Sequence, residues 1–219
     1  MIPVKICGIT RLEDALSCIR HGVTALGFIF APSKRRVTPD VVREICKALP
    51  PFIVRVGVFV DQDPWVIRDL LRDCCLDLAQ LHGNEPVKDA EILEGRVIKA
   101  FHAGDAALDP IWRDAPLRAV LIDSGKSGSG GSGIVFDWNR VEPFRTLGFP
   151  LILAGGLHPG NVERAIRTVR PDGIDLAGGV EKAPGIKDEA MIGDLMTVLR
   201  RMESDFDIDS RGDGLDRQG

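Results

Sequence analysis

Two side chains near the ends of apolar segments could carry acid–base chemistry. Cys7 lies in the segment 4–9, and Asp123 is the last residue of the segment 119–123. A thiolate beside cations removes protons, and a buried carboxyl that keeps its proton donates one. Each residue also has an ordinary role, because strand cysteines more often serve packing and strand-end aspartates often cap turns. The two form a candidate base and acid if the fold brings both ends to one rim.

Glycine pairs follow two later apolar segments, in the sequences LAGGL and DLAGGVE. Glycine lets the backbone approach an anion closely, and exposed N–H groups there bind phosphate. In a barrel of alternating strands and helices, the loops after the seventh and eighth strands are the usual phosphate site. The two pairs therefore predict a phosphate site in the loops that contain Gly155, Gly156, Ala177, Gly178 and Gly179.

A basic segment, PSKRRV (32–37), stands out in an acidic chain. An arginine that points into the mouth of a site holds a carboxylate through two parallel hydrogen bonds. Arg35 and its neighbour Arg36 are the candidates for such a clamp. A solvated basic turn is the alternative.

A regular alternation of strands and helices carries these residues. Apolar, β-branched segments predict eight strands, at 4–9, 25–30, 53–60, 77–81, 97–101, 119–123, 151–154 and 173–176. Amphipathic stretches predict helices between them, including 12–20, 39–49, 64–71 and 161–169. Thr38 and Asp63 are helix-start residues, each followed by proline. Eight such units predict an α/β fold, a (β/α)8 TIM barrel in a single domain over 1–202, with an open doubly wound sheet as the alternative.

Strand alternation predicts which side chains share a face. Lys5 and Cys7 lie on one face of the first strand, and Gln80 and His82 share a face of the fourth. In the segment VRVGVFV (54–60), we expect the valines to face the helices, with Arg55 and Gly57 pointing into the barrel. A charge inside a barrel needs a partner.

The eighth strand supplies the expected partner of Lys5. Asp175 lies on that strand, which neighbours the first strand once the barrel closes. We therefore predict an ion pair between Lys5 and Asp175. Finding the two side chains on opposite faces of the sheet would contradict it.

The glycine- and serine-rich stretch within VLIDSGKSGSGGSGIVFDW (120–138) has three interpretations. A nucleotide-binding loop requires G-x-x-x-x-G-K-[ST], but Val120 stands where the first glycine belongs. A flexible linker fits the composition, yet it would split a regular alternation of strands. We therefore interpret residues 124–133 as a lid over Asp123 at the carboxyl end of a strand.

Composition excludes several classes of protein. A formal net charge of −4 disfavours a nucleic-acid surface, and the chain contains no membrane-length apolar segment or secretory signal. The five cysteines include no C-x-x-C pair, so neither a disulfide framework nor a metal site is expected. A cytoplasmic protein without nucleic-acid or membrane partners is therefore predicted. The acidic, non-periodic segment 203–219 is expected to be a disordered tail.

Several strings together resemble the phosphoribosylanthranilate isomerase family. They run in order from KICGIT (5–10) through SKRRV, RVGVFV, QLHG, LID, GGSG, FDW and LAGGL to GVEKAPGIKD (179–188). The resemblance covers residues 4 to about 200. It implies an Amadori rearrangement of N-(5-phosphoribosyl)anthranilate to 1-(2-carboxyphenylamino)-1-deoxyribulose 5-phosphate, the third step from chorismate in tryptophan biosynthesis.

The resemblance also assigns roles to residues. It implies that Asp123 protonates the furanose oxygen, Cys7 removes the C2′ proton and Arg35 holds the anthranilate carboxylate. Lys5, His82 and Asp175 would support the site. No cofactor is implied, and the partner would be a small phosphorylated substrate bound by a monomer or a homodimer.

One departure concerns the phosphate loop. Where the family usually has two serines, this chain has Ala177 and Gly178. Each lost hydrogen bond to a charged oxygen would cost about 1.5–3 kcal/mol, so a raised Michaelis constant is expected. A non-catalytic barrel that binds phosphorylated ligands is one alternative. The other is an isomerase of a related aminated sugar phosphate, as in the histidine pathway, but that enzyme uses paired aspartates.

Overall fold

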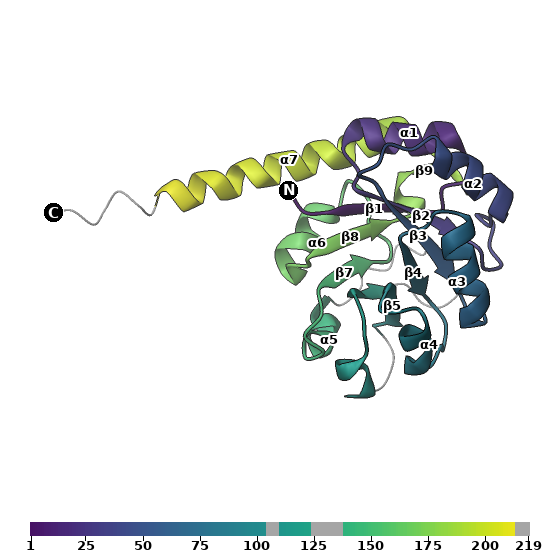
Figure 1. The fold of residues 1–219 in the computed structure, drawn as a ribbon. Coiled ribbons are helices and arrows are strands. Elements are labelled where there is room, and N and C mark those ends of the chain that lie inside the picture. Colours follow the sequence, from purple (N-terminus) through teal and green to yellow (C-terminus); the bar gives the residue numbers. More distant parts are fainter. Residues whose placement is uncertain (104–109, 124–137, 213–219) are drawn as a thin grey trace.

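The structure, a computed structural model, describes residues 1–103, 110–123 and 138–212, excluding the side chains of 138–139 and 205–212. Its centre is a closed barrel of eight parallel strands in sequential order (Figure 1). The strands are β1 (Val4–Cys7), β2 (Ala25–Ile29), β3 (Val54–Phe59), β4 (Leu78–Leu81), β5 (Val97–His102), β6 (Ala119–Asp123), β7 (Leu151–Ala154) and β8 (Gly173–Leu176). This confirms the predicted TIM barrel, and the open doubly wound sheet was wrong.

Helices surround the barrel and connect its strands. They are α1 (Leu12–His21), α2 (Pro39–Lys47), α3 (Pro64–Asp73), α4 (Val87–Ile92), α5 (Glu142–Arg145), α6 (Val162–Val169) and α7 (Glu189–Gly212), with 3-10 turns η1 (Pro110–Asp114), η2 (Trp138–Val141) and η3 (Gly178–Val180). Both expected start residues act as caps, because Thr38 accepts from Val41 N and Asp63 accepts from Trp65 N. These caps satisfy N–H groups that a helix leaves unpaired.

The core has two layers. The larger layer lies between the strands and the helices and includes Phe28, Phe59, Leu81 and Ile122. A smaller apolar cluster fills the barrel interior and includes Val56, Ile98 and Leu121. Interior packing by branched side chains is the normal filling of this fold.

The predicted orientation of β3 was wrong. Val56 belongs to the interior cluster, whereas Phe59, two residues along from Gly57, belongs to the outer layer. Arg55 shares this outward face and forms an ion pair with Asp77, at 2.8 Å between Nη2 and Oδ1. Alternation alone fixes which residues share a face, but not which face turns inward. The outer ion pair accommodates the arginine that we expected inside.

The ion pair that closes the barrel was predicted correctly. Lys5 lies opposite Asp175 in the register of β1 and β8. Lys5 Nζ is 2.9 Å from Asp175 Oδ2, and both side chains are buried. The first and last strands of the barrel are therefore joined by an ion pair as well as by backbone pairing.

A short antiparallel hairpin follows β8 and was not predicted. It consists of β9 (Glu181–Ala183) and β10 (Ile186–Lys187), joined at Pro184 and Gly185. Strands this short give no readable alternation, although the Pro-Gly pair is a turn signal. The hairpin lies beside α1 at one end of the barrel (Figure 1).

Helix α7 differs from the expected domain end at residue 202. Its backbone stays helical to Gly212, so 203–212 are helical where we expected a disordered tail. Between Gly193 and Gly212 the sequence contains neither glycine nor proline, so no strong stop signal interrupts the helix. Residues 213–219 lie outside the described part of the chain.

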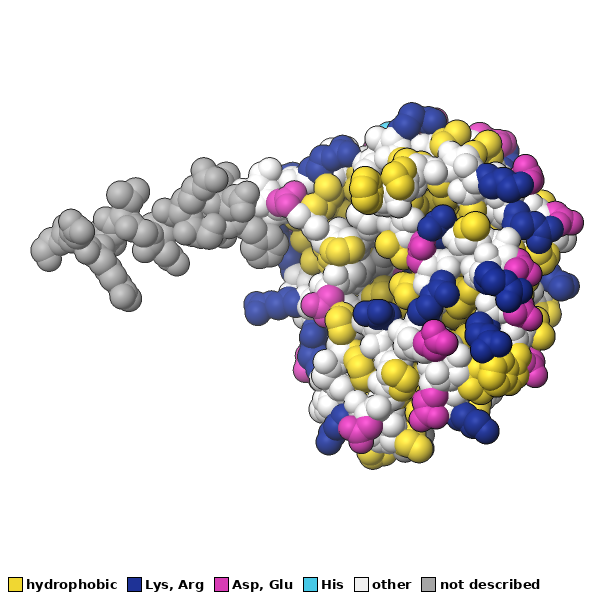
Figure 2. Space-filling model, in the orientation of Figure 1, with side chains coloured by type: hydrophobic (Ala, Val, Ile, Leu, Met, Phe, Trp, Pro, Cys, Tyr) yellow, Lys and Arg dark blue, Asp and Glu magenta, His cyan; other side chains and the backbone are white. Residues whose placement is uncertain are grey.

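The surface mixes charges of both signs. Basic and acidic side chains are interspersed over the face seen in Figure 2, with apolar side chains between them. Such mixing differs from the one-sided basic stripe of a nucleic-acid-binding protein. Among the described residues, no helix combines the length and apolarity needed to cross a membrane.

Candidate active site

The proposed base and acid come from the carboxyl ends of two strands. Cys7 ends β1 and Asp123 ends β6. All eight strands run parallel, so these ends belong to the same rim of the barrel. Cys7 is buried, whereas about a quarter of the Asp123 side chain is exposed. The rim therefore combines a shielded thiol with a carboxyl that a ligand can reach.

The environment of Cys7 favours the thiol over the thiolate. Burial raises the pKa of Cys7 above its ordinary value, and the carboxylate of Asp175 adds to this. Lys5 and Lys187 oppose the shift because each cation stabilises a thiolate. Burial prevails, so Cys7 is a protonated thiol at neutral pH.

Asp123 is held by a neighbouring histidine. His82 Nε2 lies 3.5 Å from Asp123 Oδ2, and Gln80 Nε2 lies 2.8 Å from His82 Nδ1. Gln80 and His82 share a face of β4, as predicted, and that face is the barrel interior. The contact with Gln80 fixes the imidazole ring so that one nitrogen is directed at the carboxyl.

Arg35 turns toward the site and Arg36 does not. The Arg36 side chain is exposed, while Arg35 is half-buried and forms three hydrogen bonds with Glu181. Arg35 Nε is 2.9 Å and 3.0 Å from the two carboxylate oxygens, and Nη2 is 2.7 Å from Oε2. These bonds raise the pKa of Arg35 and keep it charged. Glu181 therefore already occupies the Nε–Nη2 edge of the guanidinium that we expected to bind a substrate carboxylate.

The glycine loops after β7 and β8 approach each other closely. A Cβ at Gly179 would lie 1.8 Å from the carbonyl oxygen of Leu157, so only glycine fits there. Gly155 and Gly156 have positive φ values of 87° and 64°, which L side chains rarely adopt. The structure thus brings the two predicted phosphate segments together. The predicted lid, residues 124–133, lies outside the described residues.

Two charged residues of this rim were missed by sequence analysis. Glu181 and Lys187 belong to the β9–β10 hairpin, and Lys187 Nζ is 2.8 Å from Glu181 Oε1. Lys187 Nζ also donates to the carbonyl oxygen of Cys7 at 2.6 Å. We selected candidate residues at the carboxyl ends of predicted barrel strands, and neither Glu181 nor Lys187 lies at such an end. The spacing E-x-x-P-G-x-K across a turn was the available signal.

The fold and these groups define a class, the (β/α)8 barrels with acid–base residues at the carboxyl ends of their strands. A family model described as N-(5′-phosphoribosyl)anthranilate (PRA) isomerase matches residues 4–198. The chain belongs to the N-(5′-phosphoribosyl)anthranilate isomerase family. The resemblance read from the sequence is thereby confirmed.

Individual relatives support this assignment over nearly their full lengths. The chain is 48% identical over 195 residues to the N-(5′-phosphoribosyl)anthranilate isomerase of Geobacter sulfurreducens, covering 88% of this chain and 95% of the relative. A phosphoribosyl anthranilate isomerase solved with reduced 1-(o-carboxyphenylamino)-1-deoxyribulose 5-phosphate is 38% identical, with a TM-score of 0.78 over 92% of this chain and 100% of the other. Monomers of the dimeric isomerase from Thermotoga maritima are 36% identical, with a TM-score of 0.77 over 91% and 99%.

Proposed function

We propose that this protein isomerises N-(5-phosphoribosyl)anthranilate to 1-(2-carboxyphenylamino)-1-deoxyribulose 5-phosphate, in tryptophan biosynthesis. The observation that carries the proposal is the placement of Cys7 and Asp123 on one rim in a chain of this family. The chemistry is an acid–base rearrangement, for which a thiol and a carboxyl suffice.

The first step uses Asp123 as the acid. Its carboxyl proton passes to the furanose ring oxygen while the bond from that oxygen to C1′ breaks. The nitrogen lone pair forms the C1′–N double bond, which gives an open-chain Schiff base and leaves Asp123 as a carboxylate. His82, 3.5 Å away, faces the charge that develops on Asp123.

The second step uses Cys7 as the base. Its thiolate takes the C2′ proton, and the electrons of that C–H bond move to form an enolamine. The positive Schiff base makes this proton acidic, and Lys5 and Lys187 stabilise the thiolate before transfer. The enolamine then tautomerises to the ketone product.

We further propose how the ligand is held. Arg35 faces the anthranilate carboxylate, and Gly155, Gly156, Ala177, Gly178 and Gly179 form the phosphate site. The close approach of the two glycine loops supports the phosphate assignment. The half-buried guanidinium of Arg35 supports the carboxylate assignment.

Loss of anthranilate-type fluorescence from freshly generated substrate tests the function. Wild type should turn over, and Cys7→Ser and Asp123→Asn should each lose activity by about a hundredfold or more. Cys75→Ser is the matched control, because Cys75 is exposed and its loss should change nothing. A folded wild type without turnover would instead favour the non-catalytic barrel.

We propose a homodimer as the assembly, with the monomer as the alternative outcome. The support is the dimeric relative from Thermotoga maritima and the side chain of Phe52, which is 95% exposed just before β3. Exposed aromatic side chains are common anchors of interfaces. Light scattering should give a dimer mass that Phe52→Ser shifts toward the monomer. A monomeric wild type would contradict the proposal.

A further inference from the structure

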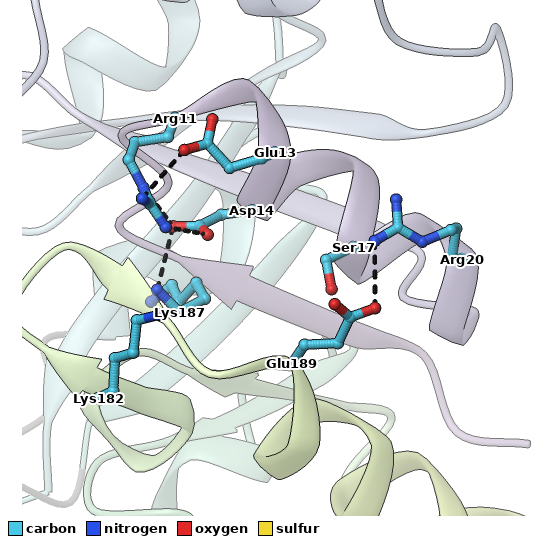
Figure 3. Close-up of a pocket in the computed structure, with 8 residues that line it drawn as sticks. All are labelled: Arg11, Glu13, Asp14, Ser17, Arg20, Lys182, Lys187 and Glu189. Carbon is cyan, nitrogen blue, oxygen red and sulfur yellow. Dashed lines mark hydrogen bonds and ion pairs between the residues drawn. The ribbon is translucent and has the colours of Figure 1, made fainter.

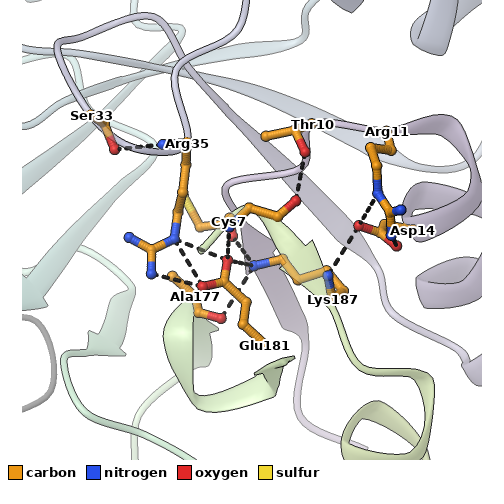
Figure 4. A network of polar contacts seen from close by, with 10 residues as sticks. Cys7, Thr10, Arg11, Asp14, Ser33, Arg35, Ala177, Glu181 and Lys187 are labelled. Atoms are coloured by element: carbon orange, nitrogen blue, oxygen red, sulfur yellow. Dashed lines mark hydrogen bonds and ion pairs between the residues drawn. The ribbon is translucent and has the colours of Figure 1, made fainter. Parts of the chain in front are cut away.

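A buried cluster of three charges lies beside Cys7 at the mouth of the barrel (Figure 4). Glu181 accepts from Arg35 on one side and from Lys187 on the other. The side chains of Glu181 and Lys187 are 4% and 1% exposed, whereas that of Arg35 is 26% exposed. The carboxylate is therefore shared by an enclosed cation and a cation that reaches the mouth.

The charges of this cluster do not cancel. Two cations share one carboxylate, and the other acceptors around Lys187 are the carbonyl oxygens of Cys7 and Ala177, at 2.6 Å and 3.2 Å. Carbonyl oxygens carry no formal charge, so one positive charge remains. Since Lys187 is enclosed, that charge is available to a ligand through Arg35. A single carboxylate on the ligand would balance it.

Glu181 also determines which edge of Arg35 a ligand meets. It binds Nε and Nη2, and no described residue bonds Nη1. The Nη1–Nη2 edge therefore remains for an incoming carboxylate. A guanidinium with one edge fixed loses less conformational freedom when its other edge binds.

The chain supports this orientation of Arg35 from two sides. A Cβ at Gly8 would lie 2.6 Å from Arg35 Cδ, so Gly8 leaves the room that the arginine stem occupies. A Cβ at Gly178 would lie 3.4 Å from Arg35 Nη2, an ordinary van der Waals contact, so η3 packs against the guanidinium without excluding a side chain there. The backbone around the guanidinium thus fits its observed position.

The hairpin that carries Glu181 and Lys187 is fixed to the outside of the barrel. The backbone N–H of Lys187 donates to Asp14 at 3.0 Å, and Arg11 pairs with Asp14 at 2.6 Å. These groups line an outer cavity of about 310 Å³ between α1 and the hairpin (Figure 3). Thr10 Oγ1 donates to the carbonyl oxygen of Gly185 at 2.6 Å. The carboxylate of Glu181 therefore belongs to a hairpin that is held at its turn and at its second strand.

We infer that Glu181 is a positioning residue for recognition of the substrate carboxylate, which acts through Arg35 and is itself held by Lys187. This inference rests on the proposed function and deepens it. The one positive charge left on this cluster favours a substrate group with a single carboxylate. Glu181 does not touch the reacting atoms.

A double-mutant cycle tests the inference. The variants Glu181→Gln, Arg35→Met and the double variant are compared on N-(5-phosphoribosyl)anthranilate and on N-(5-phosphoribosyl)aniline, which lacks the carboxylate. Glu181→Gln should raise KM for the first substrate about tenfold, with kcat changed less than about threefold. KM for the aniline substrate should not change. The double variant should be no worse than Arg35→Met alone, because both act through one contact.

Controls separate positioning from a merely structural role. Glu189→Gln removes a carboxylate eight residues after Glu181 that is exposed and pairs with Arg20, outside the cluster, so its kinetics should match wild type. Arg35→Lys keeps the positive charge, but an ammonium group lacks the two edges that bind Glu181 and the substrate carboxylate. This variant should therefore also raise KM for N-(5-phosphoribosyl)anthranilate and leave KM for the aniline substrate unchanged. This variant keeps the test decisive if Glu181→Gln does not fold.

Three results would overturn the inference: additive losses in the double variant, an equal rise in KM for both substrates, or wild-type KM values in Arg35→Lys. A folded wild type without turnover would overturn the proposed function instead. The two failures are distinguishable because wild-type turnover is measured first.

Discussion

At the scale of the residue, Cys7 has a demanding position. Its sulfur must accept a proton, yet burial raises its pKa. Lys5 on the same strand and Lys187 on the hairpin offset this only in part. A carboxylic acid ordinarily loses its proton at lower pH than a thiol does. Catalysis requires Asp123 with its proton and Cys7 as a thiolate. The dominant form has Asp123 as a carboxylate and Cys7 as a thiol, so the two forms hold the same number of protons.

This equality predicts an unusual pH profile. Two forms with equal proton counts keep a constant ratio as pH changes, so kcat/KM should be flat through neutral pH. Above the pKa of Cys7 the acid form becomes scarce and kcat/KM should fall. Because burial raises that pKa, the fall should begin above the ordinary thiol value of about 8.5.

The profile is measured under kcat/KM conditions, which report the free enzyme. Substituting Lys5 by Met removes a cation that stabilises the thiolate, and should move the fall to higher pH. Cys46→Ala, on helix α2 away from the rim, is the control. A fall that begins below pH 8 would show that the free enzyme stabilises the thiolate instead.

At the scale of the element, sequence patterns located the barrel strands well but could not orient them. Three strands, β6, β7 and β8, have the predicted bounds. Asp123 ends the apolar run of β6, and glycine pairs follow the other two strands, directly after Ala154 in β7 and one residue after Leu176 in β8. The alternation in β3 is symmetric between its faces, and Arg55 found its partner on the outside. Cys7 and Asp123 were selected because strand ends are readable in sequence. Glu181 was not selected, because its role depends on Arg35 and Lys187, which only the fold brings together.

The loops after β7 and β8 give a prediction for phosphate affinity. Gly179→Ala cannot fit against the carbonyl oxygen of Leu157, so it should displace the loop and raise KM about tenfold or more. Introducing the family's serines as Ala177→Ser with Gly178→Ser should lower KM, by about tenfold for each hydrogen bond to the phosphate. Both are measured by steady-state kinetics.

Gly173→Ala is the matched control for these loops. Its Cβ would be 3.5 Å from the nearest atom, an ordinary contact, and it lies at the opposite end of β8. Unchanged KM in the serine double variant would indicate that backbone N–H groups alone hold the phosphate. An unchanged KM in Gly179→Ala would contradict the phosphate assignment of this loop.

At the scale of the whole molecule, the barrel is closed by the buried pair of Lys5 and Asp175. Replacing Lys5 by Met leaves the carboxylate of Asp175 buried without its cation. We expect a loss of about 3–5 kcal/mol in the free energy of unfolding, measured by urea titration. The double variant Lys5→Met with Asp175→Leu should recover most of this loss, because it removes both charges.

An exposed pair provides the comparison. Lys47 Nζ and Glu44 Oε1 lie 2.9 Å apart on α2, and both side chains are exposed. Lys47→Met should therefore leave the free energy of unfolding unchanged. Equal losses in the single and double variants at Lys5 and Asp175 would mean that packing, rather than the charge, accounts for the effect.

The position of this pair also bears on how the chain is synthesised. Lys5 leaves the ribosome 170 residues before Asp175. Until then, any compact arrangement that buries β1 must bury an uncompensated ammonium group, which is costly. Lys5 therefore disfavours premature closure of an incomplete sheet and keeps the edge of β1 open for its last neighbour. Lys5 thus stabilises the complete barrel and, during translation, disfavours closure of the sheet before β8 is available.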